Sequence, residues 1–186
     1  MGSDKAALTF EGQTLLERAV GIVSKVTGNV IVVARADQSS GSTFAGLPAR
    51  IVHDSIDYLG PLAGLAAGLG ASTTDLNLVV ACDMPLIKPE VLQRLLDLRE
   101  NADICVAVVE GQPSPLCAAY RASVGGVATA MLNAGERRVM ALLDRVLTKR
   151  VDAAAFRDID PNLDSFISCD TPEEFSAALK CRPSGT

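Results

Sequence analysis

The sequence predicts an α/β protein with a doubly wound, mainly parallel sheet that carries helices on both faces. Two observations support this fold class. Short apolar runs rich in β-branched residues alternate along the chain with segments whose apolar residues recur at helical spacing. The strand-like runs are continuously apolar, as expected for parallel strands that helices cover on both sides.

Each element is placed by its own pattern. Helical spacing predicts a helix over 15–26. The turn-rich segment EGQPS separates the runs 102–109 and 115–120, which we expect to be adjacent strands. Near the C-terminus, Thr171 as N-cap, Pro172 at the first helical position and Glu174 at the third form a capping box, which predicts a helix start. The polar stretch 37–46 is predicted to be a flexible loop. The remaining predicted elements are strands over 30–34, 50–53, 76–82, 102–109 and 115–120, and helices over 61–69, 89–100 and 122–134.

Composition limits the class of protein. The 186 residues are 48% hydrophobic, which is enough for one well-packed core, so we expect a single domain over 1–186. A net charge of −5 argues against a partner that is a nucleic acid or an anionic membrane. No apolar run reaches the roughly 18 residues of a membrane span, and no secretory signal pattern opens the chain. We therefore expect a cytoplasmic protein.

Cysteine and histidine usage narrows the metal chemistry. The five cysteines form no C-x-x-C pair and are expected to be reduced thiols. His53 is the one histidine, which excludes a His-rich zinc site. Magnesium, held by carboxylates and phosphates, is the metal that this composition leaves to consider.

Asp83 is the first candidate site residue. It follows the predicted strand 76–82 in VVACDMP, and Pro85 prevents the strand from continuing. Ligands of open α/β sheets bind outside the carboxyl ends of the strands, where an aspartate is placed to hold a metal on a phosphate. The alternative is that Asp83 is a turn residue or caps the next helix.

Glycines and cations supply the other candidates. Gly60, with Pro61, and Gly64 would allow close backbone approach to a flat or phosphorylated ligand, whereas Gly68 and Gly70 are better explained by helix packing. Lys5 could neutralise phosphate charge, but most lysines in such a position are solvated, and on Lys5 alone the solvated position is favoured. AGERRVM contains two adjacent arginines, Arg137 and Arg138. They could bind phosphate bidentately or belong to a solvated face.

Together these stretches resemble one family, the molybdenum cofactor guanylyltransferases, within the nucleotidyltransferases that build sugar nucleotides and cytidylyl compounds. The matching stretches are MGSDKAAL with GQTLLERA, the DS at Asp54 and Ser55 ahead of GPLAG, CDMP, AGERRVM and TPEEF. They occur in the family's order over nearly the whole chain. The resemblance implies a Rossmann-like fold of the nucleotide-diphospho-sugar transferase type.

It also implies a reaction and roles for residues. GMP would pass from GTP to the phosphate of molybdenum-bearing molybdopterin, with release of pyrophosphate. Lys5 would contact the nucleotide phosphates, Asp54 and the segment Gly60–Gly64 would lie around the nucleotide, and Asp83 would bind Mg²⁺. Arg137 and Arg138 would help to hold the anionic pterin. Possible further partners are other molybdenum cofactor biosynthesis proteins and the molybdoenzymes that accept the product.

The chain also departs from the family's pattern. It begins within the family's L-x-G-G-x-S-x-R-M-G segment, so the first strand and most of the Gly-rich loop are missing, and we expect the natural chain to start upstream of Met1. Ser168 and Asp170 replace two asparagines, and Ala34 stands where asparagine is frequent.

Two alternatives to the guanylyltransferase remain open at this point. One is a cytidylyltransferase for the same cofactor. The other is a catalytically impaired, pterin-binding homologue that lacks the nucleotide loop.

Overall fold

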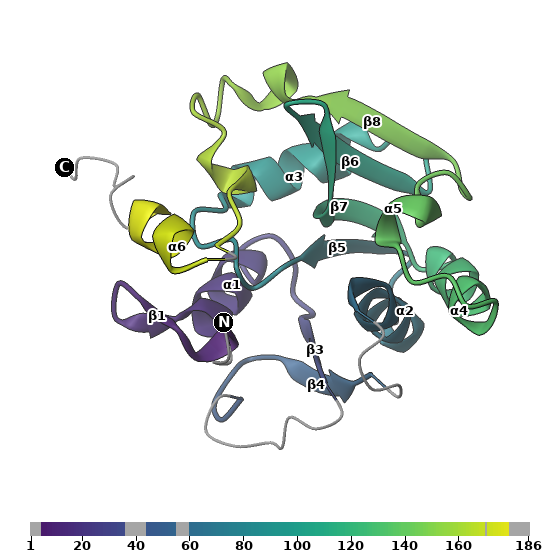
Figure 1. Cartoon of the computed structure of the whole chain (residues 1–186), viewed down its shortest axis with the longest axis horizontal. Helices are drawn as coiled ribbons and strands as arrows, with labels where there is room; N and C mark the ends of the chain where they lie inside the picture. The colour runs from purple at the N-terminus through teal and green to yellow at the C-terminus, as the bar shows by residue number, and fades with distance from the viewer. Residues whose placement is uncertain (1–4, 36–43, 55–59, 170, 179–186) are drawn as a thin grey trace.

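Two hydrogen-bonded sheets organise the molecule in the computed structural model, which describes residues 5–35, 44–54, 60–169 and 171–178 (Figure 1). The larger sheet has the strand order β5-β7-β6-β8, and the smaller one pairs β3 with β4 in parallel. These strands are β3 (Ile31–Ala34), β4 (Arg50–His53), β5 (Leu76–Val80), β6 (Ile104–Val109), β7 (Gln112–Arg121) and β8 (Thr148–Asp152). A short hairpin of β1 (Thr9–Phe10) and β2 (Gln13–Thr14) precedes them.

The α/β class predicted from the sequence is confirmed, with one refinement to the strand directions. β7 runs antiparallel to both β5 and β6, whereas β6 and β8 are parallel, so the larger sheet is mixed. The tight turn between β6 and β7 explains the reversal. Glu110 and Gly111 both have positive φ angles, 51° and 78°, as two-residue hairpin turns that match the strand twist require.

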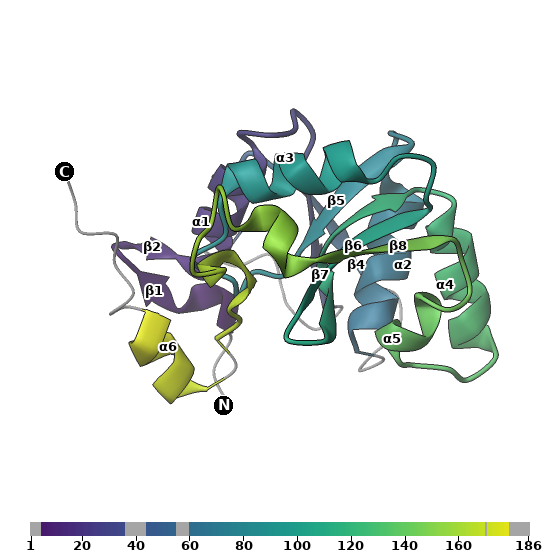
Figure 2. The same cartoon turned by 90° about the horizontal axis from the view of Figure 1, so that it is seen from above.

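Helices cover both faces of the larger sheet (Figure 2). One face packs against α1 and α3, and the other packs against α2, α4 and the single turn of α5. Alternation along β6 separates the two cores: Ile104 and Val106 belong to the α2/α4 side, and Cys105 and Ala107 to the α3 side. The helices are α1 (Leu15–Val23), α2 (Pro61–Ala71), α3 (Pro89–Leu98), α4 (Val124–Asn133), α5 (Val139–Leu142) and α6 (Pro172–Ala178).

Local signals in the sequence account for both ends of the chain. At α6 the predicted capping box is present, because the Thr171 N–H donates to Glu174 and the Glu174 N–H donates to the Thr171 hydroxyl, at 2.9 and 3.1 Å. A second capping box, of Thr14 and Glu17, begins α1.

None of the described helices combines the length and the apolar character that crossing a membrane requires.

Several elements were not predicted. They are the short β1 and β2, α5, β8 and three 3₁₀ turns at Lys5–Ala7, Ala153–Phe156 and Asp164–Phe166. All are short or, like β8, carry a polar sequence. Of the loop predicted over 37–46, residues 37–43 lie outside the described residues, and 44–46 form a turn.

Candidate functional site

The turn that carries Asp83 leaves the carboxyl end of β5 and is anchored to distant parts of the chain. The Cys169 N–H donates to the Asp83 carbonyl oxygen at 2.8 Å. The Arg18 guanidinium, from α1, donates to the carbonyl oxygen of Pro85. Met84, which is buried, fixes the turn from within the core. The half-buried Asp83 is therefore held at a strand end where α/β sheets bind ligands.

Asp54 occupies the equivalent position on the neighbouring pair of strands. Its N–H donates to the Ala34 carbonyl oxygen at 3.0 Å, which continues the β3–β4 ladder to the strand ends. Its Oδ1 is buried and has no hydrogen-bond partner among the described residues. A buried carboxylate oxygen without a partner is costly, so the position favours a donor or a cation from a ligand.

The segment from Gly60 to Gly64 begins α2. Gly60 adopts φ +73° and ψ −168°, a conformation that a side chain would strain, and Pro61 starts the helix. No acidic residue lies in the first turn, so the positive end of the helix dipole is not neutralised locally. This start is chemically suited to a phosphate group.

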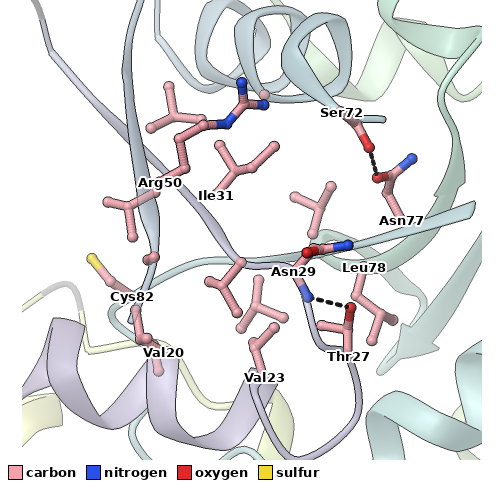
Figure 3. Close-up of a pocket in the computed structure, with 18 of the residues that line it drawn as sticks. Val20, Val23, Thr27, Asn29, Ile31, Arg50, Ser72, Asn77, Leu78 and Cys82 are labelled. Atoms are coloured by element: carbon pink, nitrogen blue, oxygen red, sulfur yellow. Dashed lines mark hydrogen bonds between the residues drawn. The ribbon is translucent and has the colours of Figure 1, made fainter. Parts of the chain in front are cut away.

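A cavity of about 1610 Å³ extends between β3 and β5, with α1 and α2 contributing to its walls (Figure 3). Its middle is apolar, with Val20 and Val23 of α1 and Leu78 of β5 among the lining residues. Its polar residues lie at the two ends of the strands. At the amino ends these are Thr27, Asn29, Arg50, Ser72, Thr73, Thr74 and Asn77, and at the carboxyl ends they are Arg35, Cys82 and Asp83.

This cavity brings together some of the predicted site residues but not all of them. Pro61, Gly64 and Asp83 line it. Asp54 and Gly60 are not among its lining residues. The side chain of Lys5 lies outside the described residues. The residue that follows it, Ala6, lies on the cavity wall.

The two arginines of AGERRVM make contacts within their own segment. Arg137 donates to the Leu132 carbonyl oxygen at 2.8 Å and so caps the end of α4. Arg138 pairs with Glu136 at 2.7 Å, and its side chain remains 78% exposed. Hydrogen bonds from Arg138 lower the pKa of Glu136 to about 2. Arg138 is thus the more accessible of the two for an anion.

Comparison with known proteins identifies the family. Residues 1–150, which include all of the predicted site residues, match the model of the MobA-like NTP transferase domain. The chain belongs to this family. It is 35% identical to a probable molybdenum cofactor guanylyltransferase of Methanothermobacter thermautotrophicus, over 94% of this chain and 90% of that protein.

Solved structures of the family type have the same fold. A molybdopterin-guanine dinucleotide biosynthesis protein A from Archaeoglobus fulgidus superposes with a TM-score of 0.83 and 25% identity, over 96% of this chain and 90% of that one. The 2-C-methyl-D-erythritol 4-phosphate cytidylyltransferase of Thermus thermophilus has a TM-score of 0.72 at 17% identity, over 96% and 93%. The latter likeness concerns the fold alone.

The MobA-like chain also contains residues in or behind the candidate site that the sequence analysis missed. Arg35 lines the cavity at the end of β3. The sequence did carry a signal for it, because Arg35 is a cation directly after a predicted strand. Lys88 and Asp160 pair at 2.9 Å behind the Asp83 turn, and the Ser165 N–H donates to Asp160 at 2.8 Å. No local pattern reveals this pairing, because its members are far apart in the sequence.

The donor set is compatible with a phosphate-bridged metal. Among the described residues, no group of three or more His, Cys, Asp or Glu side chains is arranged to hold a metal ion by itself. Mg²⁺ is usually bound by one or two carboxylates, with substrate phosphates and water completing its shell. A half-buried Asp83 and the orphaned Oδ1 of Asp54 fit that chemistry.

Proposed function

We propose that this chain transfers GMP from GTP to the phosphate of molybdopterin, forming the guanine dinucleotide cofactor and releasing pyrophosphate. The observation that carries the proposal is the 35% identity, over nearly the whole chain, to a probable molybdenum cofactor guanylyltransferase. The position of Asp83 at the end of β5, beside the cavity, agrees with a nucleotide site at the strand ends.

The chain's residues would act by binding and charge stabilisation. The acceptor phosphate is already an anion, so its attack on the α-phosphate of GTP needs no protein nucleophile and no general base. Negative charge grows on the α-phosphate and on the leaving pyrophosphate, and Lys5 would offset it. The start of α2 at Gly60 and Pro61, together with Gly64 and Asp54, would hold the nucleotide.

Mg²⁺ is the proposed cofactor, with Asp83 as its protein ligand. When bound, it would stabilise the phosphate charge as a Lewis acid. Arg138, and more weakly Arg137 because it also caps α4, would attract the pterin phosphate. The proposed setting is the cytoplasm, and the proposed partners are GTP, molybdopterin, other proteins of cofactor synthesis and the molybdoenzymes that accept the product.

The test is a pyrophosphate-release assay with purified molybdopterin, Mg²⁺ and either GTP or CTP. We expect release with GTP, and we expect Asp83→Ala to lower kcat at least about 100-fold, the scale of losing one charge-stabilising group in a transition state. Asp97→Ala, an exposed carboxylate on α3 outside the cavity, is the matched control. Turnover with CTP alone would identify a cytidylyltransferase, and a fully active Asp83→Ala variant would remove Asp83 from the mechanism.

A further inference from the structure

Every carbonyl oxygen of the turn 83–86 accepts a hydrogen bond. In chain order, the donors are the Cys169 N–H at 2.8 Å, the Ile87 N–H at 3.3 Å, the Arg18 guanidinium and the Ser165 hydroxyl at 3.4 Å. Two of these donors are backbone groups and Ser165 is fully buried, but Arg18 reaches the turn from α1 and is only half-buried. Arg18 is therefore the donor whose position depends on a long side chain.

Pro85 gives the contact with Arg18 its weight in the turn. A proline has a fixed φ and no N–H, so its carbonyl oxygen is the backbone group through which a hydrogen bond can hold it. The Nε–H of Arg18 donates to that oxygen. Just before it in the chain, the Met84 side chain is buried and the Asp83 carbonyl oxygen is bonded to Cys169. Arg18 thus fixes the downstream side of the backbone that carries the Asp83 carboxylate.

Three contacts hold the Arg18 guanidinium itself. Besides the bond to Pro85, its Nη1 lies 3.1 Å from a carboxylate oxygen of Glu11, and its Cζ lies 5.0 Å from the centroid of the Phe10 ring. Phe10 is buried and packs edge-to-face on Phe175 of α6, with ring centroids 5.9 Å apart. The β1–β2 hairpin and α6, which gather with α1 at one end of the molecule (Figures 1 and 2), therefore set the orientation of Arg18.

Glu11 occupies a backbone position that favours other residues. Because Phe10 pairs with Gln13, Glu11 and Gly12 form a two-residue hairpin loop, and their φ angles are 51° and 83°. Such a loop prefers Asn-Gly, Asp-Gly or Gly-Gly, and a glutamate in the left-handed region is strained. The ion pair with Arg18 is the contact that glutamate makes there and that glycine could not make. The hairpin is accordingly suited to holding Arg18 as well as to turning the chain.

We propose that Arg18 is a positioning residue for Asp83, and that through the Pro85 carbonyl oxygen it holds the turn in the geometry that a ligand of Mg²⁺ needs. This inference rests on the proposed function, in which Asp83 binds Mg²⁺. Mg²⁺ demands near-ideal octahedral geometry, so a carboxylate on a loose turn binds it less well. The guanidinium is engaged by its three contacts, and Arg18 is not among the residues that line the cavity. It therefore acts through the turn.

The first test measures the order of the turn in the full 186-residue chain without ligands. Arg18→Lys keeps the positive charge but loses the planar group that makes several contacts at once. Amide hydrogen exchange should become at least about tenfold faster at Cys169 and Ile87, whose N–H groups bond to the turn. Exchange at Ala81, which bonds to the Leu116 carbonyl oxygen outside the turn, should stay within about twofold.

The second test measures the metal. The probe is Mn²⁺ together with an α,β-methylene analogue of GTP, whose bridge is not cleaved, and water-proton relaxation follows the bound Mn²⁺. We expect Arg18→Lys to weaken Mn²⁺ binding about 10- to 100-fold, the usual loss when a group that supports a metal ligand is removed. In turnover, the Mg²⁺ concentration for half-maximal rate should rise and kcat should fall, with KM for molybdopterin within about twofold. A merely structural role would lower Tm without moving the metal constants.

Arg121→Lys is the matched control for this substitution. Arg121 pairs with Asp75 at 2.9 Å, at the opposite end of β5 from Asp83. Its side chain is 32% exposed, against 25% for Arg18. We expect Arg121→Lys to leave both the exchange of the turn amides and the affinity for Mn²⁺ within about twofold of the parent chain.

Glu11→Asn separates positioning from stability and also serves if Arg18→Lys does not fold. Asn-Gly is a favoured pair for this loop, so Tm should stay the same or rise. Loss of the ion pair should nevertheless loosen Arg18. We expect about two- to fivefold faster exchange at Cys169 and Ile87, and Mn²⁺ binding weaker by a similar factor, which is the scale of one exposed ion pair. A lower Tm with unchanged Mn²⁺ binding would contradict the proposal.

The outcomes distinguish the role of Arg18 from the proposed function. If the parent chain binds Mn²⁺ with the GTP analogue, the role of Arg18 is overturned when Arg18→Lys matches the parent either in exchange of the turn amides or in Mn²⁺ affinity. Both changes together, with Arg121→Lys unaffected, support it. A parent chain that binds neither Mn²⁺ nor the analogue would contradict the proposed function, and the role of Arg18 with it.

Discussion

Asp160 and Lys88 form an ion pair of 2.9 Å in which the carboxylate is fully buried and the ammonium group is partly exposed. Lys88 precedes α3 and follows the Asp83 turn, whereas Asp160 belongs to the irregular segment after β8. The Ser165 N–H donates to the same carboxylate, and the Lys88 N–H donates to the Ser165 hydroxyl. The pair therefore ties the C-terminal segment to the loop that carries the proposed metal ligand.

The stability of this connection should depend on pH. Burial raises the pKa of Asp160, but hydrogen bonds from Lys88 and Ser165 and the charge of Lys88 outweigh burial, and the pKa lies below its ordinary 3.8. A lowered native pKa contributes stability above the unfolded pKa, and that stability is lost as pH falls through about 4 and below. We expect Asp160→Asn to lower the free energy of unfolding at pH 7 by about 1–3 kcal/mol and to reduce its fall below pH 4.

Urea unfolding of both proteins at pH 7, 4.5 and 3.5 measures this effect. Asp144→Asn is the matched control, because Asp144 is an exposed partner of Arg150. A variant with the same acid dependence as the parent chain would show that Asp160 does not contribute to it.

Two adjacent glycines of α4 should respond oppositely to alanine. A Cβ at Gly125 would lie 3.0 Å from the Leu69 Cβ and 3.3 Å from the backbone nitrogen of Gly70, in α2. At Gly126 a Cβ meets nothing within 4 Å. We expect Gly125→Ala to destabilise the fold by about 1–3 kcal/mol through overpacking, and Gly126→Ala to stabilise it by about 0.5–1 kcal/mol. Thermal unfolding of both variants measures the difference, and a stabilising Gly125→Ala would contradict the close α2–α4 contact.

The sequence predicted the elements whose signals are local and strong, and missed those that depend on distant contacts. The capping box at Thr171 is a three-residue pattern, and the structure contains it. β8 escaped prediction because its sequence TKRVD is polar, with Val151 as its one buried residue. It becomes a strand by pairing with β6, which no local signal specifies.

The same distinction applies to the candidate site. Asp83 follows an apolar run, so the prediction that strand ends carry ligand groups placed it where the structure has a strand end. Asp54, which was proposed from the family resemblance, also directly follows a strand. The partners of Arg138 were not predictable in the same way, because the choice between Glu136 and an anion depends on how the turn after α4 folds. The kinetic predictions for Asp83 and Arg138 test the roles of these residues directly.

Arg138 should affect one substrate more than the other. If it attracts the pterin phosphate, Arg138→Ala will raise KM for molybdopterin about 10- to 100-fold, the equivalent of one charge-assisted hydrogen bond, and leave KM for GTP unchanged. Tm should not move, because the side chain is 78% exposed. Arg150→Ala is the control, because Arg150 lies on β8 and its exposed pair with Asp144 is broken. Equal effects on both KM values would contradict a role specific to the pterin.

Thiol reactivity provides an independent probe of the cavity. Burial raises the pKa of Cys117 to about 12 and also raises that of Cys105, so both thiols should stay protonated and unreactive at pH 8. Cys82 is half-buried and lines the cavity at the carboxyl end of β5. In a Cys181→Ser background, iodoacetamide should therefore modify Cys82 first, as peptide mapping will show. Faster labelling of Cys117 than of Cys82 would mean that the β5–β7 core opens more readily than the cavity admits reagent.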